Sequence, residues 1–312
     1  MNTGFLVIVM IVLLGLFQGS DLQTEERGAE MTFYQDVAWS PEGKTLATSA
    51  MRIQRSLWEK ERFGAFQKSQ FDIYLVPADG SPKVQITNNP KNDLWAVWWP
   101  GGRCLLYTAE QTGSAGLSFV KADGSDQQTM KGLPGRASQP SVSSDGKNIA
   151  FMSREGSESH IYLITTESNN PIKLSSAGPN NWNPVWSPDG KSIVFFSDRR
   201  GKGQDQIFVV NADGSGETQL TNDEFNNVFP SWSPDGKRII FGSNRGGKGN
   251  ESIYVMDADG SNLHLLNPSI RAEFARWSPD GKKLAFVSAV EFPDTQIYIA
   301  DADGSNPTQV TK

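Results

Sequence analysis

The sequence has 312 residues, 37% of them hydrophobic, with 30 glycines, 17 prolines, a net charge of −6 and an isoelectric point near 5.1. This apolar content is enough for a buried core and excludes a wholly disordered chain, while the acidic balance argues against general nucleic-acid binding, which needs clustered Lys and Arg. The single cysteine, Cys104, excludes an intramolecular disulfide, and His160 and His264 cannot supply a multi-histidine metal site.

The N-terminal residues differ from everything that follows. Residues 5–17 (FLVIVMIVLLGLF) are apolar, and charged residues begin soon after Ser20. This run fits the hydrophobic region of a secretory signal and is short for a membrane span. Residues 1–4 carry no Lys or Arg and no small-x-small cleavage site follows. We therefore expect residues 1–20 to be a signal peptide or an uncleaved anchor, and the chain to be exported, periplasmic or secreted.

After an N-terminal segment at residues 21–35, one short motif recurs six times. Trp-Ser-Pro-Asp-Gly-Lys begins at Trp186, Trp232 and Trp277, and related copies begin at Trp39, Trp98 and Val142. The copies after the first interval are about 45 residues apart, a period typical of β-propeller blades. A second motif, Ala-Asp-Gly-Ser, follows in step in five of the six units, and residues 166–169 (TESN) replace it in the third. Two motifs in register indicate a repeat protein.

One unit shows how the repeat folds. In residues 229–266, a short strand A ends at Trp232, and Ser-Pro-Asp-Gly then supplies the Pro and Gly of a tight turn. Strand B (237–241) is apolar on both faces, which indicates burial on both sides. A variable connection leads to strand C (252–256), and Asp-Gly turns the chain into strand D (263–266).

Four short strands buried on both faces describe a propeller blade. We predict an all-β fold, a six-bladed β-propeller of four-stranded antiparallel blades over residues 36–312. The last strand, 308–311, completes the sixth unit by itself, and residues 31–35 could add a strand near the seam. The approximate units are 36–90, 91–134, 135–179, 180–225, 226–270 and 271–312.

Taken together, WSPDGK, a strand such as IYVM and ADGS resemble the PD40 (WD40-like) repeats of the TolB-like propeller family. The resemblance covers nearly all of residues 36–312 and implies the fold more specifically than any function. The sequence has no Gly-x-Ser-x-Gly elbow, and little room precedes the repeats for the α/β domain of TolB. We therefore expect a stand-alone propeller without the TolB N-terminal domain or a peptidase domain.

Strand alternation places the B–C and D–A connections on one face of the disc, which we call the variable face. The B–C connection of unit one, roughly 51–70, is the longest and mixes basic with aromatic residues. These could anchor a partner, or the loop could fold over the disc and bury its own aromatics. The candidate binding residues of this inserted loop are Arg55, Trp58, Arg62, Phe63 and Phe66.

The D–A connections lead into the innermost strands, so their residues should surround the mouth of the central channel. Amides, both charges and an indole could hold a peptide end, a sugar or another polar ligand. The alternative is that they merely line a wet channel. The candidate mouth residues are Asn92, Asp93, Arg136, Asn181, Trp182, Asn226, Asn227, Arg271 and Glu273.

We expect a monomeric, non-catalytic interaction module of the envelope or secreted space that docks a protein or peptide on the variable face. One alternative is binding of a small polar ligand or glycan at the channel mouth. A less favoured one is a polysaccharide lyase or hydrolase, for instance with Glu273 and Asp93 as paired carboxylates. We expect no cofactor, no metal, no nucleic acid and no membrane contact beyond the N-terminal signal.

Overall fold

The computed structural model describes residues 30–61, 63–111, 114–168, 170–174, 180–199, 201, 204–247, 251–272, 274–288 and 295–311, without the side chains of 63, 66 and 67. The predicted signal, residues 1–20, lies outside this part. None of the helices in the described ranges is long and apolar enough to cross a membrane.

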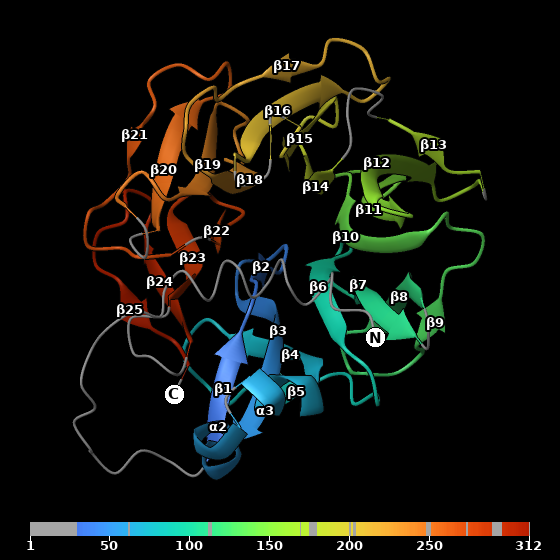
Figure 1. Cartoon of the computed structure of the whole chain (residues 1–312), viewed down its shortest axis with the longest axis vertical. Coiled ribbons are helices and arrows are strands. Elements are labelled where there is room, and N and C mark those ends of the chain that lie inside the picture. Colours follow the sequence, from blue (N-terminus) through green and yellow to red (C-terminus); the bar gives the residue numbers. More distant parts are fainter. Residues whose placement is uncertain are drawn as a thin grey trace.

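Six antiparallel sheets stand in a ring (Figure 1). Blades 2 to 6 each hold four strands in chain order from the axis outward. The outermost strands have only two residues each, so little unpaired edge is presented to solvent. The predicted six-bladed propeller is confirmed. Blade 2 consists of β6 (Asp93–Trp98), β7 (Cys104–Gln111), β8 (Ser114–Lys121) and β9 (Gln128–Thr129), and blade 3 of β10 (Arg136–Val142), β11 (Asn148–Glu155), β12 (Glu158–Thr165) and β13 (Ile172–Lys173). Blade 4 consists of β14 (Asn181–Trp186), β15 (Ser192–Ser197), β16 (Gln206–Asn211) and β17 (Thr218–Gln219), and blade 5 of β18 (Asn227–Trp232), β19 (Arg238–Ser243), β20 (Ser252–Asp257) and β21 (His264–Leu265). Blade 6 consists of β22 (Phe274–Trp277), β23 (Lys283–Ser288), β24 (Gln296–Asp301) and β25 (Thr308–Gln309).

Blade 1 departs from this pattern at its inner edge. Two segments, β1 (Glu30–Tyr34) and β2 (Ala38–Trp39), pair one after the other with the long strand β3 (Thr45–Gln54). The possible strand at residues 31–35 is thus confirmed as β1. The outer strands are β4 (Phe71–Pro77) and β5 (Val84–Gln85), and two short helices, α2 (Arg55–Glu61) and α3 (Phe63–Lys68), connect β3 to β4.

The hydrophobic core lies between neighbouring blades. Met152 of blade 3, for example, packs in one cluster with Trp186 and Phe195 of blade 4. Tryptophans of the repeat also join blades through their indole nitrogens: Trp98 donates to the carbonyl of Ala38 at 3.1 Å. Apolar residues on both faces of strand B are therefore explained by contact with two neighbours.

The repeated turns are held by their own side chains. In blade 4 the Ser187 hydroxyl donates to Asp189 at 2.6 Å, and the same carboxylate oxygen accepts the amide of Lys191 at 3.1 Å. Gly190 in this turn has a φ of +69°, which disfavours a residue with a Cβ. The conserved spacing of Ser, Asp and Gly within the motif is thus turn chemistry.

Candidate functional site

Near the axis, the inner strands of blades 2 to 5 each contain a β-bulge. The pairing register shifts there by one residue, and the third residue before the repeat Trp or Val has a positive φ of 52° to 59°. Positive φ in a residue other than glycine is uncommon and re-aims the side chain. The four residues are Trp95, Gln139, Asn183 and Phe229.

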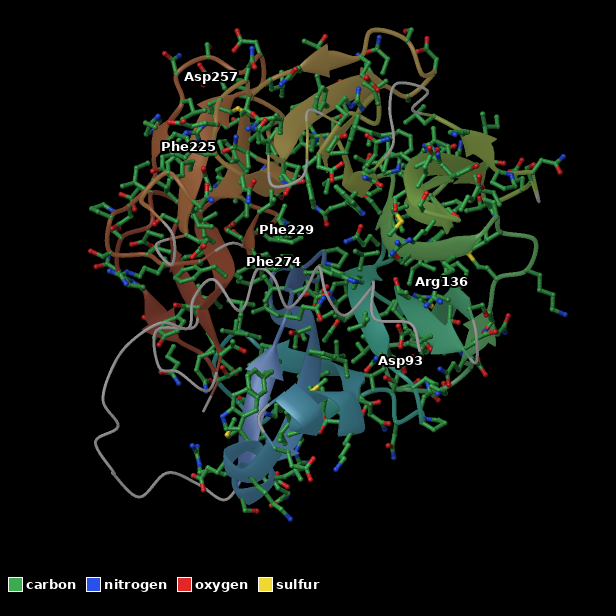
Figure 2. The ribbon with its side chains drawn as sticks, in the orientation of Figure 1. Asp93, Arg136, Phe225, Phe229, Asp257 and Phe274 are labelled. Carbon is green, nitrogen blue, oxygen red and sulfur yellow. The ribbon has the colours of Figure 1, made fainter. Side chains whose placement is uncertain are left out.

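These bulges bring side chains from opposite blades together. The ring of Trp95 in blade 2 lies 6.1 Å from that of Phe229 in blade 5 and 5.5 Å from that of Phe274 in blade 6. Phe229 and Phe274 are neighbours near the centre of the disc (Figure 2), with ring centroids 3.7 Å apart. Aromatic side chains therefore fill the axis at this level. None of the three is among the predicted mouth residues, although all three are the third residue before the repeat Trp.

The same repeat position in blade 1 holds a buried carboxylate, Asp36. It accepts the amide of Ser49 at 2.6 Å and the Ser49 hydroxyl at 3.1 Å, and burial raises its pKa to about 6. Burial lowers the pKa of Arg276 in blade 6 to about 10, and the attraction of Asp36 opposes that shift. The centre of the disc thus holds a buried carboxyl group and a guanidinium group that interact electrostatically, as well as the aromatic group.

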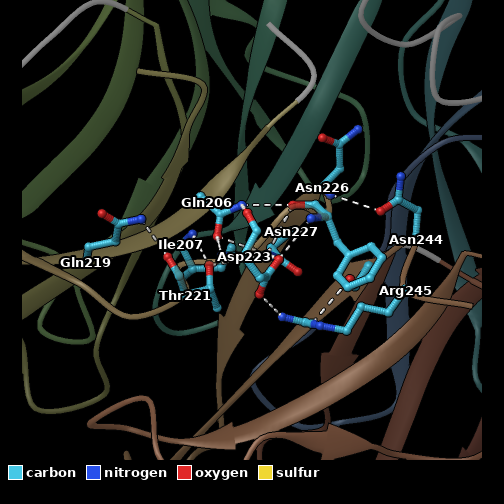
Figure 3. Close-up of polar contacts among 11 residues, drawn as sticks. Gln206, Ile207, Gln219, Thr221, Asp223, Asn226, Asn227, Asn244 and Arg245 are labelled. Atoms are coloured by element: carbon cyan, nitrogen blue, oxygen red, sulfur yellow. Dashed lines mark hydrogen bonds and ion pairs between the residues drawn. The ribbon is translucent and has the colours of Figure 1, made fainter. Parts of the chain in front are cut away.

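Most of the amides predicted at the channel mouth are engaged within the protein. Asn227 is fully buried. Its side-chain nitrogen lies 3.2 Å from the side-chain oxygen of Gln206 and 3.1 Å from the Asp223 carboxylate (Figure 3). Its neighbour Asn226 accepts the amide of Asp205 at 3.3 Å through its side chain. These contacts join the D–A connection to the start of the inner strand.

Asn181 and Asn92 are likewise engaged. The carbonyl oxygen of the fully buried Asn181 accepts from Arg199 at 2.8 Å. Asn92 accepts the amide of Phe71 and donates to Glu110 at 2.8 Å. These side-chain atoms bind other parts of the chain, so their role in the structure is to position connections.

Two carboxylates are close neighbours where blade 1 meets blade 2. Asp93 is 1% exposed and accepts from Asn89 at 2.6 Å, while Asp72 accepts from Gln85 at 3.0 Å. Burial is the main cause that raises the pKa of each to about 6, and the charge of Asp72 adds to the shift of Asp93. The predicted partner of Asp93 in a catalytic pair, Glu273, lies outside the described residues.

Three other predicted mouth residues keep exposed surface. Arg136 is half-buried at the start of β10, on the inner strand of blade 3 (Figure 2), and Trp182 is half-buried on β14 with its ring 5.5 Å from Phe196. Arg271 is exposed, and its backbone carbonyl accepts the Ser288 hydroxyl. Arg136 and Trp182 lie on strands that contact each other, β10 and β14; β10 also contacts β6, which begins at Asp93, and β14 contacts β18, which begins at Asn227.

The inserted connection of blade 1 is a helical layer instead of a loop. Strand β3 continues to Gln54, and α2 and α3 fill most of the remainder, since residues 55–61 (RSLWEKE) are suited to a helix and contain no Pro or Gly. Trp58 is 8% exposed, and its ring lies 5.7 Å from that of Phe33. The alternative in which the insertion buries its own aromatic is confirmed for Trp58. Arg55 is half-buried, Arg62 is outside the described residues, and Phe63 and Phe66 belong to α3 without described side chains.

No group of three or more His, Cys, Asp or Glu side chains in the described ranges is arranged to hold a metal ion. The prediction that the channel mouth binds a ligand stays a prediction, with Arg136, Trp182 and Arg271 among its accessible members.

Comparison with known proteins agrees with this architecture. A family model described as the TolB beta propeller domain, PD40, matches residues 117–311. An uncharacterized protein of Agrobacterium fabrum is 32% identical over 126 residues, which are 40% of this chain and 42% of that protein. The chain spans less than half the length of that relative.

Solved structures share the fold at low sequence identity. A putative TolB from Agrobacterium tumefaciens superposes with a TM-score of 0.62 at 22% identity, covering 87% of this chain and 97% of that one. An oligogalacturonate lyase from Vibrio parahaemolyticus gives 0.58 at 14% identity, covering 93% and 80%. Both likenesses concern the fold alone.

Proposed function

Since this chain belongs to the PD40 family of TolB β-propeller domains, we propose that it is a non-catalytic module of the cell envelope that docks a protein or peptide on its variable face. The apolar run at residues 5–17, if it acts as an export signal, supports the envelope location. Family membership establishes the fold but does not identify the function, so the choice among functions has to be argued from the residues on the surface.

One observation carries the proposal: α2 and α3 form a packed layer on the variable face, and no other B–C connection contains a helix in the ranges that the structure describes. Trp58 and Ala65 are buried in one cluster with Met31 and Phe33 of β1. A preorganised surface loses less conformational entropy on binding than a flexible loop, so such a layer suits a docking site.

The outward side of this layer is charged. Glu59, Lys60 and Lys68 are exposed, and Lys68 forms an ion pair with Glu61 at 2.6 Å. Exposed charges at the rim of an interface set the association rate and the choice of partner more than the affinity. Lys60 has no ion pair within the described residues, which leaves it open to an acidic group of a partner.

The test is a crosslinking pull-down from envelope extract with three variants. Lys60→Glu reverses a charge on α2, and replacement of residues 55–68 by a short Gly-Ser linker removes the layer. Lys44→Glu is the matched control, because Lys44 is exposed in the A–B turn on the opposite face. We expect a specific partner that Lys44→Glu retains and the other two lose. Equal retention by all three would exclude α2–α3 as the docking surface.

The proposal includes no catalytic activity, and the fold likeness to oligogalacturonate lyase is the reason to test that directly. Incubation of the full chain with oligogalacturonate, with and without Mn²⁺, should leave the substrate intact. Release of unsaturated products at a rate proportional to protein concentration would contradict a non-catalytic module.

A further inference from the structure

Two arginines stand directly opposite each other in blade 3. Arg136, the first residue of β10, is the cross-strand partner of Arg154 on β11, and both are half-buried. Like charges in this position repel each other and destabilise a strand pair. Neither guanidinium forms an ion pair or side-chain hydrogen bond with any residue that the structure describes. A local conflict of this kind is typical of a functional site.

The backbone holds the two arginines together. Gly135, directly before Arg136, has a φ of +53°, and a Cβ there would lie 2.7 Å from the Ser153 hydroxyl and would clash with the carbonyl oxygen of Arg154. The Ser153 hydroxyl donates to the carbonyl of Pro134 at 2.5 Å. The D–A connection is therefore fastened to the end of β11, and the pair cannot separate by a shift of register.

Both side chains face blade 4. Met152, two residues before Arg154 on the same face of β11, packs against Trp186, and β10 and β11 both contact β14. Strand β14 (NWNPVW) carries no acidic residue and presents the half-exposed Trp182. The carboxylates near the two arginines either lie on the other face of the sheet or already have partners within the protein.

Those nearby carboxylates are Glu155 and its cross-strand partner Glu158 on β12, which both lie on the other face of the sheet. Glu155 accepts the Tyr162 hydroxyl at 2.7 Å, and Glu158 lies 3.1 Å from the His160 ring nitrogen. In blade 4, Glu217 is ion-paired with Arg199, which also donates to Asn181 at the start of β14. Strands β10, β11 and β14 thus supply two cations and no counter-charge to this point of the variable face.

We propose that Arg136 and Arg154 form a carboxylate-binding subsite that receives an acidic segment of a docked polypeptide. The proposal rests on the protein-docking function above and names the chemistry of the partner. A planar guanidinium binds a carboxylate through two parallel hydrogen bonds, and two adjacent guanidinium groups can take one carboxylate each or share one. The bound anion would also remove the repulsion between the arginines.

Titration followed by NMR tests the subsite directly. The probe is a hexaglutamate peptide, observed through the Nε–Hε signals of the full chain, with assignments from Arg136→Lys and Arg154→Lys. We expect saturable shifts of these two signals, none with hexaglutamine, and weaker binding at higher salt. Saturable binding of a glucuronate trisaccharide or of inorganic phosphate without hexaglutamate binding would overturn the choice of a peptide.

Matched variants separate a built subsite from general charge attraction. Arg136→Gln and Arg154→Gln should each weaken hexaglutamate binding at least tenfold and raise the melting temperature of the free protein, because each relieves the repulsion. Arg103→Gln, an exposed change of equal charge on the opposite face, should alter neither. Equal loss in all three variants, or no change on either substitution in blade 3, would overturn the proposal. A failure of the Lys60→Glu test would instead concern α2–α3, since these measurements involve no protein partner.

Discussion

The indole nitrogen of Trp39 donates a hydrogen bond of 3.1 Å to the carbonyl oxygen of Arg276 and so joins blade 1 to blade 6. The indole nitrogen of Trp98 donates the equivalent hydrogen bond to the carbonyl oxygen of Ala38 between blades 2 and 1. Each blade is built from its own stretch of chain, and β25 completes blade 6 by pairing with β24. The ring therefore closes by packing between blades, without exchange of a strand between the two ends of the propeller.

The seam also has contacts of its own. Both the amide and the carbonyl of Tyr34 lie within hydrogen-bond distance of the Thr295 hydroxyl, at 2.5 and 2.9 Å. Val37 and Leu46 of blade 1 share a buried cluster with Ile297 of blade 6. These contacts predict that the seam is as firm as an interior boundary between blades.

Substitution of Trp39 tests that equivalence. Trp39→Phe removes this part-buried hydrogen bond, which should lower the free energy of unfolding by about 1 kcal/mol. Trp98→Phe is the internal control and should cost a similar amount. Urea unfolding of both variants gives the comparison, provided that the m-value is unchanged. A loss for Trp39→Phe far below that for Trp98→Phe would mean that the ring opens at the seam.

The blade architecture was predictable because its signals are local. Ser, Pro, Asp and Gly act within a few residues of each other, as Ser187, Asp189 and Gly190 show, and they repeat at a fixed interval. The seam required one further inference, that residues 31–35 pair as a strand. Because residues 308–311 complete the last blade by themselves, the sequence did not require a strand exchange between the ends, and β1 is an addition to blade 1.

The centre of the disc was not predictable in the same way. The position three residues before the repeat Trp holds Asp36, Trp95, Asn183, Phe229 or Phe274, so its chemistry does not repeat, although Trp95, Asn183 and Phe229 share a positive φ. The partners of the mouth amides are also distant in sequence: Gln206 precedes Asn227 by 21 residues. Packing between neighbouring blades brings such residues together.

The aromatic group at the axis should be a main source of stability. Phe229 is 4% exposed and contacts aromatic rings of three other blades, so Phe229→Ala should leave a cavity and cost about 3–5 kcal/mol. Ile172→Ala is the control, because Ile172 is 70% exposed on the outer strand β13, and it should change stability by less than about 0.5 kcal/mol. Thermal unfolding distinguishes them. Similar small effects would show that the axis is loosely packed.

The helical layer should respond locally to the loss of its buried anchor. Trp58→Ala removes the side chain that packs on Phe33, while the strands of all six blades pair without α2 or α3. We expect faster amide exchange in residues 55–68 and unchanged exchange in β15 and β19, because these strands lie in blades 4 and 5. Hydrogen exchange by mass spectrometry resolves these segments. A uniform increase over all blades would instead mean that the layer is required for the whole fold.

Asp93 should make the protein less stable as the pH rises. Its pKa is about 6 in the folded state, above the value near 3.9 of an unfolded chain, so the folded state holds the proton more tightly between about pH 4 and 6. The contribution of Asp93 to stability should therefore be largest below about pH 4 and be lost as the pH rises to about 6. Blade 5 carries Asn227 at the equivalent position, which shows that an amide fits there. Asp93→Asn should accordingly stabilise the protein at pH 8 by about 1–3 kcal/mol, since two pKa units correspond to that range, and should have little effect at pH 4.

Asp79→Asn is the control, and its effect on stability at pH 8 should have the opposite sign. Hydrogen bonds from Ser81 hold the pKa of this exposed carboxyl below its usual value. Melting temperatures of the three proteins between pH 4 and 8 provide the measurement. An Asp93→Asn curve parallel to that of the unmodified protein would show that this carboxyl does not titrate with the raised pKa.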